Sequence, residues 1–86
     1  MNKDFILEDF DRDNLSGHAR TSCDNSTSAL SELEVISQAC KSKSEQMPEG
    51  YKIEHDGGEF CTCKKRDALG QSITDIHFGF EIKTDD

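Results

Sequence analysis

The sequence has little from which to build a large core. Tryptophan is absent, five phenylalanines supply most of the large aromatic side chains, and apolar residues make up 33% of the chain, the same share as charged residues. A chain of 86 residues has room for one domain, and a domain of this size buries about 60–65% of its potential surface. The composition therefore predicts a thin core and a chain that stays partly mobile.

Long apolar runs are also missing. No stretch is long and apolar enough for a signal peptide or a membrane span, so we expect a cytoplasmic protein that does not enter the membrane. Four cysteines in a short chain would suggest disulfides in a secreted protein. In a reducing compartment, they are expected to be free thiols or metal ligands.

Basic residues are few. Ten Lys and Arg face 18 Asp and Glu, which gives a formal net charge of −8. Direct binding to nucleic acid or to an anionic membrane needs clustered positive charge, and this balance opposes both. Long-range attraction instead favours a protein partner with a basic surface.

The clearest pattern in the chain lies at residues 76–82. In this segment Ile76, Phe78, Phe80 and Ile82 alternate with polar residues and a glycine. This is the pattern of an antiparallel strand with one face on a core and the other in water. A helix is predicted upstream, where apolar residues recur at intervals of three and four. These residues are Ala29, Leu30, Leu33, Ile36 and Cys40.

The limits of this helix are also predicted by the sequence. Residues 26–28 offer N-caps, whereas a later start would use the capping box of residues 31–34. Pro48 and Gly50 end the helix. We expect it to pack on the apolar row of the strand at 76–82.

Two further strands are predicted at 51–55 and 60–64. Asp56-Gly57 between them is a strong hairpin signal. The predicted fold is therefore α+β, with one amphipathic helix on a three-stranded antiparallel sheet in the order α-β-β-β. This compact part is expected to span residues 28–86.

Residues 1–27 are predicted to form an acidic arm followed by a flexible linker. The segment from Asp4 to Asp13 is compatible with an edge strand, a single helical turn or an extended arm. Residues 14–27 have the Ser, Thr and Asn content of a loop. The arm has two alternative roles: to dock into a basic-rimmed groove of a partner, or to cover part of its own sheet.

Cys61 and Cys63 share one face of their predicted strand. A two-residue turn at Asp56-Gly57 places both on the polar face with His77, whereas a three-residue turn buries them. In the favoured first register, Cys61, Cys63 and His77 are candidate zinc ligands, although C-x-C alone is a weak signal. A Cys–His nucleophile would also need an activated thiol and an oxyanion site, so we do not expect an enzyme.

The preferred functional hypothesis is a small acidic protein-interaction module, an inhibitor or adaptor without a cofactor. Its stronger form is a phage or mobile-element product whose carboxylates imitate nucleic-acid charge and occupy the channel of a nucleic-acid-binding enzyme. The alternative is a small structural zinc module. The candidate partner-binding residues are Asp4, Phe5, Leu7, Glu8, Asp9, Phe10, Asp11, Asp13, Glu54, Asp56 and Glu59, with Glu32 and Glu34 as further carboxylates.

Overall fold

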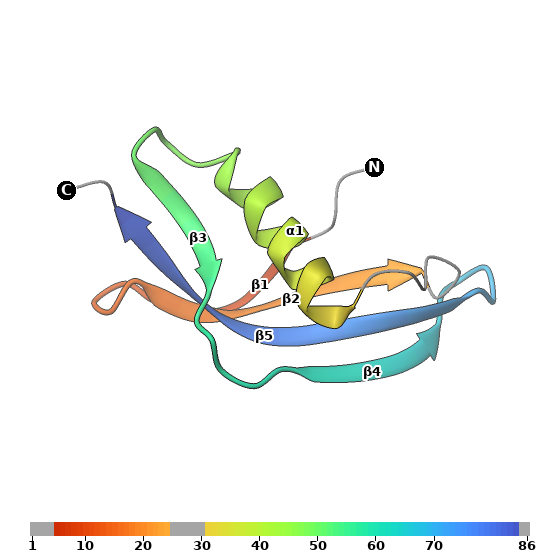
Figure 1. Ribbon diagram of the computed structural model, residues 1–86. Coiled ribbons are helices and arrows are strands. Elements are labelled where there is room, and N and C mark those ends of the chain that lie inside the picture. The colour runs from red at the N-terminus through yellow and green to blue at the C-terminus, as the bar shows by residue number, and fades with distance from the viewer. Residues whose placement is uncertain (1–4, 25–30, 85–86) are drawn as a thin grey trace.

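The computed structural model describes residues 5–24 and 31–84, and within them the fold is α+β, with one helix and an antiparallel sheet of five strands (Figure 1). The sheet therefore has two strands more than predicted. In chain order the elements are β1 (Ile6–Asp11), β2 (Ser16–Asp24), α1 (Glu32–Ser44), β3 (Tyr51–His55), β4 (Cys61–Arg66) and β5 (Ser72–Thr84).

The sheet is organised around β5, which is 13 residues long. One edge of β5 pairs with β2, while β4 and β3 pair with successive parts of its other edge. The predicted hairpin between the strands at 51–55 and 60–64 is therefore wrong. The Asp56 N–H donates to the Gly79 carbonyl (3.2 Å), so the chain continues along β5 where the Asp-Gly signal predicted a reversal.

The N-terminal segment also differs from the prediction. β1 is an edge strand, one of the three alternatives, and it forms a hairpin with β2. The loop predicted for 14–27 is wrong for residues 16–24, which form β2. There Ala19 and Thr21 are buried below the helix, so small side chains suffice where large ones would not fit. The predicted domain boundary at residue 27 lies outside the described residues.

Helix α1 uses the later of the two predicted starts. Ser31 is the N-cap, and its hydroxyl accepts a hydrogen bond from the Glu34 N–H (3.3 Å). Ala29 and Leu30, predicted on the apolar stripe, lie outside the described residues. Leu33 is 53% exposed, so its place on the stripe is wrong. The buried positions of the helix are Val35, Ile36, Ala39 and Cys40.

The core lies between α1 and the apolar row of β5. Ile76, Phe78 and Phe80 are almost fully buried, which confirms the predicted apolar row. From the N-terminal segment, Phe5 meets Phe80 edge-on (5.6 Å between ring centroids), and Phe10 stacks on it at 6.4 Å. These two phenylalanines thus cover their own sheet, as one of the two alternatives for the arm predicted.

No helix among the described residues is long and apolar enough to cross a bilayer.

Candidate interaction surface

The face of the sheet opposite α1, which we call the open face, gathers polar residues from several strands. The register aligns Asp11, Ser16 and Glu81 across β1, β2 and β5, and next to this row it aligns Asp9, His18 and Gly79. Paired residues share a face, and these positions alternate with core residues such as Phe80. Acids that are far apart in the sequence therefore lie on one surface.

The turn of the β1–β2 hairpin is held by Asp11. Its carboxylate accepts hydrogen bonds from the Asn14 side-chain amide (2.7 Å) and from the Asp13 N–H (3.0 Å). The bonds from Asn14, first through its side chain and then through its backbone, lower the pKa of Asp11. The role of Asp11 is thus at least partly structural, whereas the Asp13 side chain is exposed to solvent.

Asp9 and Glu8 have different surroundings. The Asp9 side chain is 75% exposed, and its carboxylate lies 3.6 Å from Nδ1 of His18. Glu8 sits where the register between β1 and β2 shifts. Its carboxylate lies 3.0 Å from Nδ1 of His77 and 3.9 Å from Nε of Arg20. Asp9 is therefore available to a partner, whereas Glu8 already faces positive or protonatable groups of its own sheet.

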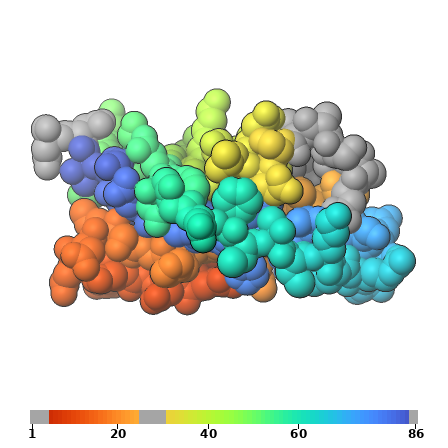
Figure 2. All heavy atoms as spheres, turned by 60° about the horizontal axis from the view of Figure 1, so that its bottom comes forward, coloured from red at the N-terminus to blue at the C-terminus, as the bar shows by residue number. Residues whose placement is uncertain are grey.

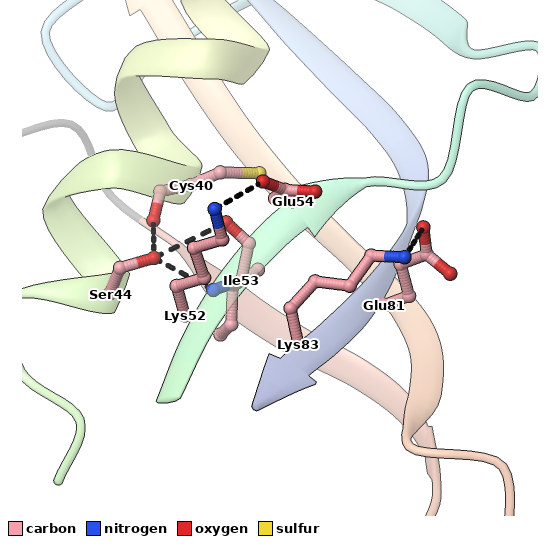
Figure 3. A network of polar contacts seen from close by, with 7 residues as sticks. All are labelled: Cys40, Ser44, Lys52, Ile53, Glu54, Glu81 and Lys83. Atoms are coloured by element: carbon pink, nitrogen blue, oxygen red, sulfur yellow. Dashed lines mark hydrogen bonds and ion pairs between the residues drawn. The ribbon is translucent and has the colours of Figure 1, made fainter. Parts of the chain in front are cut away.

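The acids of β3, of the segment after it and of the neighbouring part of β5 also contact groups of the protein itself. Glu54 lies 2.9 Å from the Lys52 ammonium, and Glu81 lies 3.0 Å from that of Lys83 (Figure 3). Asp56 accepts a hydrogen bond from the Gly58 N–H (2.7 Å). These pairs reduce the charge that this side of the sheet offers to a partner.

The Asp56 carboxylate lies over the backbone of β5 at Gly79. A Cβ at this position would meet the carboxylate, so a larger residue there would require the Asp56 side chain to shift. Asp56 lies where the chain passes from β3 to β4. Glu59, which follows in the same connection, is exposed.

Beside β3, the hydroxyl of Ser44 joins the helix to the outer edge of the strand. It accepts from the Ile53 N–H (2.7 Å) and lies within donating distance of two carbonyls, those of Cys40 (2.8 Å) and Ile53 (3.2 Å) (Figure 3). Cys40 itself is buried. Burial, with a smaller contribution from the charge of Glu54, raises the pKa of its thiol to about 11.

Cys61 and Cys63 lie on the open face, as predicted, although the hairpin behind that prediction is wrong. Cys61 pairs with His77 and Cys63 with Asp75, and both cysteines are exposed. Asp75 is bound by the Lys65 ammonium (2.6 Å). Within residues 5–24 and 31–84, no three His, Cys, Asp or Glu side chains are close enough together to hold a metal ion. The geometry thus gives the zinc alternative no support there.

The predicted partner-binding residues differ in how far they are available. Phe5 and Phe10 pack against the core. Glu8, Asp11, Glu54 and Asp56 contact neighbouring groups of the protein. Leu7, Asp9, Asp13 and Glu59 are exposed. Asp4 lies outside the described residues. Glu32 and Glu34 lie in the first turn of α1, where they complement the helix dipole.

β2 was not predicted from the sequence, and neither was the place of His18 and Arg20 on its open face. The signal was present: Gly17, Ala19 and Thr21 are small and alternate with the polar His18 and Arg20. Period-two alternation of small residues with polar ones is a weaker strand signal than the Ile and Phe alternation of β5.

The turn of the β1–β2 hairpin lies at one end of the elongated molecule, whereas β4 runs along the front toward the other end (Figure 2).

Comparison with known proteins gives no relatives: no family model, no curated protein and no solved structure matches this chain.

Proposed function

We propose that this protein is a small acidic protein-interaction module, an inhibitor or adaptor, that binds a basic surface of a protein partner. The observation that carries the proposal is the β1–β2 hairpin. There Asp9 and Asp13 present exposed carboxylates on a chain with a net charge of −8. Glu54 and Glu81 each have a lysine ammonium within 3.0 Å, whereas the neighbour of Asp9 is the exposed His18, 3.6 Å away. The hairpin is therefore where a cation of a partner would gain most.

In its stronger form, the proposal names a nucleic-acid-binding enzyme as the partner. Exposed carboxylates on the β1–β2 hairpin offer negative charge of the kind that such an enzyme already binds as phosphate. A basic channel selected for phosphates would attract the hairpin from a distance and hold it by ion pairs. No direct contact between this protein and nucleic acid is expected.

The test is affinity capture from the lysate of the native host, at low salt and again at about 0.5 M salt. We expect a specific basic protein that is retained at low salt and released at high salt. The double variant Asp9→Asn with Asp13→Asn should retain less of it. The matched control, Glu45→Gln with Glu49→Gln, removes the same charge from exposed positions near the C-terminal end of α1.

Two results would contradict the proposal. One is that no specific partner is captured at low salt. The other is that the hairpin variant and the control variant lose the same amount of partner, because binding would then follow net charge and not this surface.

A further inference from the structure

Among the described residues the sheet has three outer strands, and they differ in whether their outer backbone edges are covered. The edge of β3 is covered at Ile53, because Ser44 of α1 takes up both the N–H and the carbonyl of that residue. A covered edge cannot pair with another strand. This leaves β4 and β1, whose backbones lie away from α1.

The edge of β4 carries the basic run Lys64-Lys65-Arg66, and all residues of β4 are exposed. Lys65 binds Asp75, and the Arg66 guanidinium donates to the Gly70 carbonyl (2.8 Å). A basic strand approaching this edge would meet like charges, which disfavour cross-strand pairing.

The edge of β1 has the opposite character. Within the described chain β1 pairs with β2 alone, so its outer backbone edge is not paired with another strand, and α1 does not approach its backbone. Asp9 lies on its open face, where β1 is acidic. On the helix side Leu7 is 54% exposed, and with Phe10 it lines an apolar groove of about 170 Å³ whose other walls include Met47 and Ile82.

From these features we propose that the outer edge of β1 accepts an extended segment of the partner as an additional strand, with basic and apolar residues alternating along it. The inference rests on the proposed function and specifies how the partner is recognised. Backbone hydrogen bonds to β1 would supply affinity. The basic side chains of the bound segment would lie on the open face beside Asp9 and Asp11. Its apolar side chains would lie on the helix side next to Leu7, where they would continue the row of apolar side chains that lines the groove.

The acids of β1 also restrict what can pair with it. Charged residues and a register shift at an edge discourage unselective strand pairing, and β1 has both. An acidic strand would be repelled, and a purely apolar strand would offer no positive charge to the carboxylates of Asp9 and Asp11. The register shift at Glu8 confines regular pairing to short stretches, so the segment should bind reversibly.

The experiment is an NMR titration of the whole protein with a capped peptide in which lysine and valine alternate over about eight residues. We expect the largest amide shift changes in residues 6–11. A peptide of the same composition in block order, with the lysines together, should bind at least about tenfold more weakly, and so should the alternating glutamate–valine peptide.

Backbone pairing is tested on the peptide, so the protein need not be altered. Residues of a strand present their N–H groups alternately to its two edges. Of two peptides, one N-methylated at every valine and the other at every lysine, one should lose binding by about tenfold or more and the other should retain it. The protein variant Asp9→Lys should also weaken binding of the unmethylated peptide, whereas Glu49→Lys should not.

Several outcomes would overturn the inference. Equal binding of both N-methylated peptides would mean that attraction is by charge alone, which removes strand pairing but leaves the proposed function standing. Shift changes in β4 would place the site on the wrong edge. Self-association of the protein, abolished by Lys64→Glu, would make a second copy the occupant. Absence of peptide binding would refute the strand model, while lysate capture still tests the function.

Discussion

Ser44 allows a quantitative test of how α1 holds the edge of β3. Replacing it by alanine removes one hydroxyl, which leaves the Ile53 N–H without its 2.7 Å acceptor and also takes away the hydrogen bond to the Cys40 or Ile53 carbonyl. An unsatisfied buried polar group costs about 1–3 kcal/mol. Because this site is only partly buried, we expect Ser44→Ala to lower the free energy of unfolding by about 1–2 kcal/mol.

Urea denaturation measures the effect. With a slope of about 1 kcal/mol per M for so small a protein, the midpoint should fall by about 1–2 M. The matched control is Ser37→Ala, at an exposed position of the same helix. It should be neutral or stabilising by a few tenths of a kcal/mol, since alanine is the better helix former.

Hydrogen exchange at a single amide gives a second, local readout. The Ile53 amide should exchange roughly tenfold faster in Ser44→Ala, since about 1.4 kcal/mol corresponds to a factor of ten in an opening equilibrium. Equal midpoints for Ser44→Ala and Ser37→Ala, with unchanged exchange at Ile53, would refute the role given to this hydroxyl.

Gly17→Ala should destabilise the protein by about 1–3 kcal/mol in denaturation experiments, because its Cβ would collide with the Asp9 carbonyl and force β1 away from β2; unchanged stability would contradict this packing. Iodoacetamide at about pH 8 should alkylate the exposed Cys61 well before Cys40, whose thiol has a raised pKa and is buried, as followed by mass spectrometry. The Asp11 carboxylate should stabilise the hairpin fully above the ordinary carboxyl pKa of about 4, and this stabilisation should be lost as pH falls through the lowered pKa of Asp11. Asn14→Ala should raise the pKa of Asp11 in an NMR titration.

The pH dependence of Cys40 has the opposite sign. Its pKa in the folded protein is raised to about 11. The neutral thiol therefore contributes fully to stability below the pKa of the thiol in the unfolded chain, and this contribution is lost as pH rises through the pKa in the folded protein. Cys40→Ala should therefore reduce the alkaline loss of stability when unfolding is followed as a function of pH. An identical alkaline transition in the variant would assign that loss to other groups.

Elements with a strong apolar period were predicted correctly from the sequence, whereas the pairing of strands that depends on tertiary contacts was not. The alternation of Ile76, Phe78 and Phe80 identified the buried strand, and the capping box at Ser31 identified one start of the helix. The Asp56-Gly57 signal failed because hairpin preference is local, whereas β3 pairs with residues of β5 that lie 25–33 positions further along the chain, and β4 with residues of β5 that lie 6–16 positions further along.

The candidate surface was harder to predict than the fold. Which acids are available depends on counter-charges brought together by the register, such as His77 beside Glu8 and Lys52 beside Glu54. Sequence spacing does not show that Glu8 and His77 meet across an intervening strand. It did identify Asp9 and Asp13 as acids of the N-terminal segment, and these are exposed.

The central position of β5 constrains how the chain can fold during synthesis. β5 emerges from the ribosome after the other described elements, yet β2, β3 and β4 all pair with it. Until it emerges, β3 and β4 have no sheet to join, and β2 has only the β1 hairpin. Completion of the sheet must therefore follow translation of residues 72–84, with long loops to close, which makes folding slow for so small a protein. A nascent chain stalled before that point would expose unpaired strands, the state in which chaperone binding matters most.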